Sequence, residues 1–222
     1  MLLTALNFLD YTGSITIDGV DISTIPLQLL RTRITTICQD LIDLEGSVFD
    51  NLCLWDGSYL EEQHHGQRKM ACADILRDLG LWEKVGAAKD GLDTQVSKVG
   101  FSRGEKQLLG IARSILKTVA TKTKVVFVDE ATSNLDDDAE KKVHEAIHKM
   151  LANCTVLIVS HRPAMLEGVD FTLELENGKI VSDVRFHQTS DVPWGEAPQS
   201  KRQLGGGGLL KVVNPRVTAS KV

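Results

Sequence analysis

The feature that most constrains the fold of this chain is a short apolar run that ends in two carboxylates. In the stretch "VVFVDEATSNLD", residues 125–128 run directly into Asp129 and Glu130. Such β-branched runs are typical of strands covered on both faces. A helical pattern at about 138–151 and a second apolar run at 155–159 follow. This strand–helix–strand order predicts a parallel α/β sheet.

Polar side chains follow three of the predicted strands. Asp129 and Glu130 close the first, His161 follows the run at 155–159, and Gln39 ends "ITTICQD". Open parallel sheets bind ligands beyond the carboxyl ends of their strands. There a carboxylate can hold Mg²⁺ through water or activate a water molecule, and an imidazole can contact a phosphate. Taken singly, the pair of acids is better explained as a turn cap, and the histidine as a hydrogen-bonded residue at a strand end.

A helix start near residue 102 is a candidate phosphate site. In "GFSRGEKQLLGIAR", Ser102 and Glu105 have the spacing of a capping box ahead of an apolar stripe. Gly104 has no helix-propensity reason to occupy the first turn, but it lets a ligand approach the backbone closely. Because helix N-termini attract anions, we expect that a phosphate could lie on Ser102 and Gly104.

Composition limits the possible functions. The chain has 222 residues, of which 42% are hydrophobic and 25% charged, as in ordinary globular proteins. Its net charge of −5 gives no basic footprint for nucleic acid. No apolar run approaches the ~20 residues of a membrane-spanning helix. The four cysteines form no CxxC pair, which favours reduced, cytosolic thiols over a zinc site or a disulfide framework.

The pattern along the chain predicts one main domain and a tail. Residues 1–186 form the domain, within which 46–118 reads as a helical subdomain. Residues 187–222 hold three of the five prolines and the glycine run at 205–208, and we expect a flexible tail there. An Asp18-Gly19 pair between alternating segments predicts a β-hairpin.

Taken together and in this order, these features resemble the nucleotide-binding domain of ATP-binding cassette (ABC) proteins. The matching segments are Gln39 at the Q-loop, "FSRGEKQ" at the signature motif (usually LSGGQ), "VVFVDE" at the Walker B strand and its glutamate, 133–136 at the D-loop, and His161 at the switch histidine. The likeness covers about residues 1–185. The stretch "TGSITIDGVDISTIPLQLLRTRITTICQD" looks most like the second such domain of C-subfamily (multidrug-resistance-associated) exporters, fungal ones in particular.

The resemblance implies a P-loop NTPase-like fold and a role for each matching residue. Asp129 would hold Mg²⁺ through water, Glu130 would be the general base and His161 would sense the γ-phosphate. Further residues would contact nucleotide or metal: Gln39, Ser102, Gly104, Glu105 and Asp136. The implied cofactors are ATP and Mg²⁺. The implied partners are a second nucleotide-binding domain and the transmembrane domains of an exporter, which would hold the chain at the cytoplasmic face of a membrane.

Two departures from the family pattern affect the expected activity. The Walker A loop, GxxGxGK[ST], should precede a helix such as "LLTALNFLDY", but residue 1 falls inside that helix and no substitute occurs. We therefore expect a truncated domain that lacks the first strand and is unable to hydrolyse ATP alone, because phosphoryl transfer depends on positioning and charge stabilisation. In the signature motif Arg103 and Glu105 replace glycine and glutamine. Glu105 would repel a phosphate, and Arg103 could offset that repulsion.

Three alternatives to a transporter ATPase domain remain. The "RGEKQ" segment is also similar to the LSGGEK of chromosome-maintenance and DNA-repair ATPases, but these insert coiled coils where this chain has 61 residues between Gln39 and Phe101. A second alternative is a non-catalytic module that dimerises with an intact domain and donates its signature motif. The third is a non-functional gene fragment.

Overall fold

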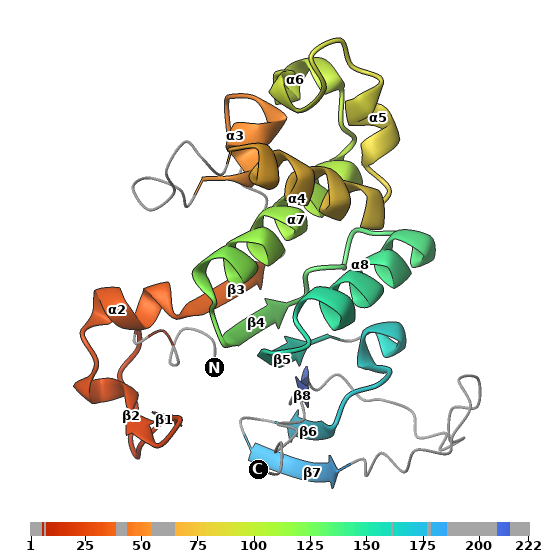
Figure 1. Cartoon of the computed structure of the whole chain (residues 1–222). Coiled ribbons are helices and arrows are strands. Elements are labelled where there is room, and N and C mark those ends of the chain that lie inside the picture. The colour runs from red at the N-terminus through yellow and green to blue at the C-terminus, as the bar shows by residue number, and fades with distance from the viewer. Residues whose placement is uncertain are drawn as a thin grey trace, which may run out of the picture.

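The structure, a computed structural model, describes residues 6, 8–38, 44–54, 65–160, 162–176, 179–185 and 208–213. Figure 1 shows a sheet flanked by helices, with α3, α4, α5 and α6 gathered at one end of the molecule. The strands are β1 (Thr16–Ile17), β2 (Val20–Asp21), β3 (Ile34–Cys38), β4 (Val125–Asp129), β5 (Thr155–Val159), β6 (Phe171–Glu176), β7 (Lys179–Arg185) and β8 (Gly208–Val213). No helix in these ranges is long and apolar enough to cross a bilayer.

The helices connect and cover these strands. The α-helices are α2 (Leu27–Thr32), α3 (Val48–Leu52), α4 (His65–Asp78), α5 (Trp82–Gly86), α6 (Val96–Val99), α7 (Arg103–Thr121) and α8 (Asp137–Met150). Single 3₁₀ turns are η1 (Ile22–Thr24), η3 (Gly91–Asp93) and η4 (Pro163–Leu166). The helices α3 to α6 and most of α7 lie in the range 46–118, for which a helical subdomain is predicted.

The predicted parallel sheet is present as β3, β4 and β5. These strands pair in parallel, and their register brings Cys38, Asp129 and Val159 level with one another. Val126 and Val128 are almost fully buried, as expected for a strand covered on both faces. The fold is therefore α/β, and the carboxyl ends of three parallel strands share one edge.

The other half of the main sheet is antiparallel. Strand β8 lies between β5 and β6, and β7 completes the order β3-β4-β5-β8-β6-β7. Strand β8 falls within the range for which we expected a flexible tail. The glycines and prolines of this range predicted a tail, but the segment "LLKVV" within it has the apolar and β-branched residues that suit a strand.

Helix α7 packs in the middle of the molecule. It contacts α3 and α4 as well as β3 and α8 (Figure 1). The predicted apolar stripe is buried as expected: Leu108, Ile111, Ala112 and Ile115. Because α7 begins at the signature motif and spans the core, the position of that motif is fixed relative to the sheet.

The predicted hairpin is also present. Strands β1 and β2 pair in antiparallel fashion, and the turn residues Asp18 and Gly19 have φ angles of 50° and 78°. Positive φ at both positions is the geometry of the tight turn that an Asp-Gly pair favours. A small cluster beneath this region packs Ile22 and Leu30 against Phe127 of β4, and so attaches the hairpin region to the sheet.

Candidate functional site

Two half-buried carboxylates stand at the edge where the parallel strands end. Asp129 is the last residue of β4, and Glu130 follows it. The backbone N–H of Glu130 donates to the carbonyl of Val159 at 3.0 Å, which ties the start of the following turn to β5. Glu130 has a φ angle of 45°, a conformation that residues other than glycine rarely adopt. Packing therefore holds this acid in an unusual backbone conformation.

The donor set at this edge suits a hard cation. Among the described residues no hydrogen bond or ion pair to the Asp129 carboxylate is found. Within the same ranges no group of three or more His, Cys, Asp or Glu residues could hold a metal by itself. A Mg²⁺ ion would fit this arrangement, because it favours one or two carboxylates together with water and phosphate oxygens over an all-protein cage.

A compact turn at 130–136 leads from the acids into α8. The N–H of Ser133 donates to the carbonyl of Glu130 at 3.2 Å, and the N–H of Leu135 donates to that of Thr132 at 3.0 Å. Asp136 is exposed and caps α8, because its side chain accepts from the N–H of Ala139 at 2.8 Å. One carboxylate oxygen of this predicted nucleotide contact is thus used to start a helix.

Gln107, which the sequence analysis did not single out, joins α7 to this turn. Its side chain is almost fully buried, and its Nε2 donates to the carbonyl of Ala131. Gln107 lies four residues after Arg103, where α7 begins, and its position resembles ordinary helix interior, so only the fold reveals the contact. The start of α7 and the turn that carries Glu130 are therefore held together.

A second buried carboxylate holds the other side of the turn. Glu140 of α8 accepts from the hydroxyl of Thr132 at 3.2 Å and from the guanidinium of Arg162 at 2.9 Å. The side chain of Glu140 is 5% exposed and that of Arg162 is 33% exposed. Thr132 lies two residues after Glu130 and Arg162 follows His161 in the chain, so this network links the ends of β4 and β5.

The predicted capping box at the start of α7 is confirmed. The hydroxyl of Ser102 accepts from the N–H of Glu105 at 3.2 Å, and the Glu105 carboxylate accepts from the N–H of Ser102 at 2.6 Å. Gly104 faces the turn, since a Cβ placed there would lie 3.7 Å from Leu135 and 3.9 Å from the carbonyl of Asn134. The signature segment and the D-loop segment are thus neighbours.

Lys84 of α5 pairs with Glu105. Its ammonium donates to the Glu105 carboxylate at 2.7 Å and to the carbonyl of Gly100 at 2.9 Å. Burial raises the pKa of Glu105, but hydrogen bonds from Lys84 and Ser102 outweigh that effect and hold the pKa below its usual range. Arg103, which we expected to offset Glu105, has no ion pair with it among the described contacts.

Two of the predicted site residues, Gln39 and His161, lie outside the described residues. Their sequence neighbours are placed: Cys38 is level with Asp129, and Ser160 follows Val159. Ser160 is buried, and its hydroxyl accepts from the N–H of Arg162 at 3.0 Å. The described part of the site thus brings together Asp129, Glu130 and the start of α7. The roles of Gln39 and His161 stay predictions.

Comparison with known proteins gives consistent matches. The family model described as "ABC transporter" matches residues 1–133. The ABC multidrug transporter B of Aspergillus fumigatus is 35% identical over 170 residues, which cover 77% of this chain and 11% of that protein. The ATP-dependent lipid A-core flippase of Thiobacillus denitrificans is 33% identical over 175 residues, which cover 76% of this chain and 28% of that protein. ATP-binding cassette sub-family B member 6 of Xenopus tropicalis is 33% identical over 178 residues, which cover 79% of this chain and 20% of that protein.

A solved structure has the same fold. It is a bacterial Atm1-family ABC exporter with ATP bound, superimposed with a TM-score of 0.67 at 23% sequence identity, covering 82% of this chain and 30% of that one. The three relatives named above are much longer than this chain, which spans 11%, 28% and 20% of their lengths.

Proposed function

This chain belongs to the ABC transporter family, and from that membership we propose that it is an ATP-binding domain of an ABC-type exporter. The observation that carries the proposal is the shared edge of β3, β4 and β5, where Cys38, Asp129 and Val159 are level. The acids at this edge and the start of α7 are adjacent through the contact between Gln107 and Ala131. One domain thus carries both the acids proposed for its own nucleotide and the helix start proposed for the nucleotide of a partner.

The proposed roles follow the chemistry of the side chains. Asp129 holds Mg²⁺ through water, which supports charge neutralisation on the phosphates. Glu130 orients and deprotonates the attacking water, and its fixed backbone helps to keep its carboxylate in position. His161 contacts the γ-phosphate, and Gln39 contacts the metal and couples it to the transmembrane partner.

The start of α7 serves a partner domain. Ser102 and Gly104 cover ATP that is held by a second nucleotide-binding domain, while Glu105 and Asp136 stand beside that interface. Exposure of Ser102 and the adjacency of Gly104 to the D-loop segment support this arrangement. The chain is held at the cytoplasmic face of a membrane through transmembrane partner domains. The C-subfamily remains our proposed subfamily, on the strength of the stretch 12–40.

By itself, the 222-residue chain neither binds ATP tightly nor hydrolyses it. Its sequence contains no GxxGxGK[ST] segment, whose backbone and lysine would provide most of the contacts to the β- and γ-phosphates. The second candidate function is a non-catalytic module that lends its signature segment to an intact domain. The complete capping box at Ser102 favours this candidate, because that half of the chemistry needs no Walker A loop. Micromolar affinity for radiolabelled ATP in the isolated chain would contradict the proposed loss of binding.

The test of the site is a variant of Glu130 in a chain to which the Walker A segment of a relative has been joined before residue 1. Glu130→Gln should abolish ATP turnover while sparing nucleotide binding, because the amide keeps the shape of the side chain but is not a base. Glu145→Gln, an exposed acid on α8, is the matched control and should retain turnover. Persistent turnover in Glu130→Gln would show that the base has been assigned wrongly.

A further inference from the structure

We propose that Lys84 is a positioning residue of the signature segment: it neutralises Glu105 and so allows a partner's triphosphate to approach Ser102 and Gly104. This inference rests on the proposed function. It concerns a feature in which this chain departs from the usual motif, since an acid stands where the motif has a neutral glutamine. The compensating charge comes from a different helix, 21 residues earlier in the sequence.

Two hydrogen bonds fix the Lys84 ammonium at this place. It donates to Glu105 at 2.7 Å and to the carbonyl of Gly100 at 2.9 Å, just before the helix start. Glu105 in turn accepts from the N–H of Ser102 at 2.6 Å. A single lysine therefore anchors both the approach to α7 and the carboxylate that completes the capping box.

The pair is better suited to control of local charge than to stabilisation. The side chains of Lys84 and Glu105 are 39% and 30% exposed, and ion pairs this close to solvent contribute little to folding free energy. A triphosphate that approaches Ser102 is highly charged, however, and responds to each nearby unit charge. With Glu105 paired to Lys84, the exposed guanidinium of Arg103 remains as an excess positive charge beside the helix start.

This arrangement predicts how each substitution changes the local charge. Lys84→Met leaves Glu105 to offset Arg103, so the helix start becomes less positive by one unit charge. Glu105→Gln raises the excess, and glutamine still suits the third position of a capping box. The double variant Lys84→Met/Glu105→Gln returns the local charge to that of the wild type. A purely structural role for Lys84 would not give this reciprocal rescue.

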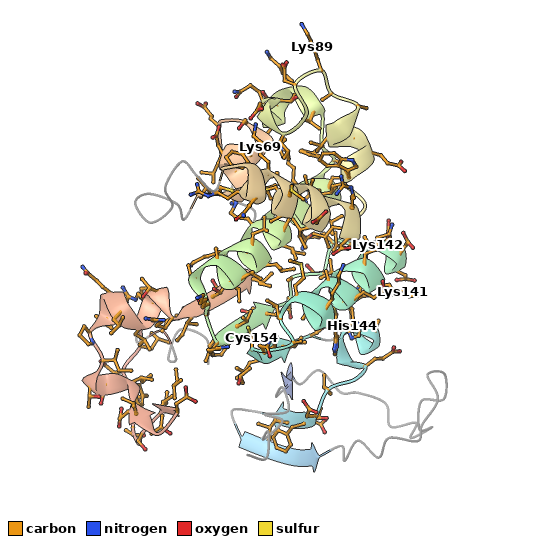
Figure 2. The ribbon with its side chains drawn as sticks, viewed as in Figure 1. Lys69, Lys89, Lys141, Lys142, His144 and Cys154 are labelled. Carbon is orange, nitrogen blue, oxygen red and sulfur yellow. The ribbon has the colours of Figure 1, made fainter. Side chains whose placement is uncertain are left out.

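The experiment measures association of the 222-residue chain with an intact ABC nucleotide-binding domain as a function of ATP·Mg²⁺ concentration. Lys84→Met should raise the half-maximal ATP concentration on the order of tenfold, with the effect shrinking at high salt. Glu105→Gln should lower that concentration, and the double variant should lie near the wild type. Lys89→Met is the matched control, because Lys89 is an exposed lysine at the outer end of the same group of helices (Figure 2) and should change nothing.

The outcomes separate this inference from the proposed function. If the wild type associates with ATP and Lys84→Met behaves identically, the inference is wrong while the function stands. If the wild type does not associate at all, the proposed function fails. Inorganic tripolyphosphate then tests the charge argument in the isolated chain, by NMR shifts of the Ser102 and Gly104 amides. Equal shifts in the wild type and in Lys84→Met would overturn the inference.

Discussion

The Nε2 of Gln107 donates a hydrogen bond to the carbonyl of Ala131, 24 residues away in the sequence. Gln107 lies in the first turns of α7 and Ala131 directly follows Glu130. One buried contact thus connects the segment proposed to cover a partner's nucleotide with the acid proposed to act on the chain's own site. A displacement of either segment would shift the other, because buried side chains have little room to adjust.

Replacing Gln107 should destabilise the chain. In Gln107→Leu the carbonyl of Ala131 loses its donor, which costs about 1–3 kcal/mol when the acceptor is buried. Loss of the Gln107 Oε1, a buried atom that has no hydrogen-bond partner among the described residues, offsets part of this cost. We therefore expect a fall of about 1 kcal/mol in the free energy of unfolding, measured with urea. Thr118→Val is the comparison variant, since in the described part of the chain the Thr118 hydroxyl donates to the carbonyl of Ser114 within α7. A Gln107→Leu variant that is as stable as the wild type would show that the contact with Ala131 contributes nothing.

The network around Glu140 should respond as a coupled pair. Glu140→Leu leaves Arg162 without its buried partner. Because Arg162 is partly exposed, we expect the free energy of unfolding to fall by about 2 kcal/mol, less than the roughly 3–5 kcal/mol typical of a fully buried pair. Arg162→Met in addition should recover part of that loss, which a double-mutant cycle of urea unfolding would measure. Lys142→Met breaks an exposed pair with Asp138 on the same helix and should have little effect. Additive losses would contradict the coupling.

Local sequence patterns predicted most of the parallel half of the sheet and its edge. The run at 125–128, the capping box at Ser102 and the Asp18-Gly19 turn each depend on residues within a few positions of one another. Such signals survive folding because nearby contacts reinforce them. The positions of Asp129 and Glu130 followed from the same rule, since parallel strands must end at a common edge.

Contacts between distant segments could not be predicted in the same way. Nothing in the sequence near Glu105 indicates that Lys84 will be its partner, and the sequence analysis expected Arg103 to offset the charge of Glu105. Gln107 occupies a helical position without a periodic signature of its own. Strand β8 takes its place by pairing with β5 and β6, so its existence depends on partners more than on its own composition.

Stability should fall at acidic pH because of His148. Burial lowers the pKa of His148 below 6.5, and nearby His144 lowers it further, while a hydrogen bond with Glu167 and the charge of Asp170 act in the opposite direction. The folded state therefore favours the neutral ring. Below about pH 6.5 the His148 ring is protonated in the unfolded chain but stays neutral in the folded chain. The free energy of unfolding therefore decreases as the pH falls toward the folded pKa.

The measurement for His148 is urea unfolding at about pH 7.5 and about pH 5.5. His148→Gln should lose less stability than the wild type over that interval, because the titrating group is gone. Lys141→Gln, an exposed position on the same helix as His144 (Figure 2), should keep the wild-type dependence on pH. An unchanged slope in His148→Gln would exclude His148 as the source.

Two thiols in the helical region should form a disulfide under mild oxidation. The Sγ atoms of Cys53, which follows α3, and Cys72 of α4 lie 3.7 Å apart. The hydrogen bond with Cys53 and burial raise the pKa of Cys72, so the partly exposed Cys53 is the sulfur that a reagent meets first. Diamide should remove one hydrogen from each thiol and be reduced to the hydrazine. Peptide mass mapping would identify the 53–72 cross-link.

The cross-link should also stabilise the chain, which distinguishes a well-placed pair from an accidental encounter. Closing a loop of this length restricts the unfolded chain by about 3 kcal/mol, less any strain that arises when the sulfurs approach. Cys53→Ser should abolish the gain. Cys154→Ser should preserve it, since Cys154 donates to the carbonyl of Thr123 in a different part of the fold (Figure 2). If both thiols remain open to alkylation after diamide treatment, the two helices do not bring them close enough to react.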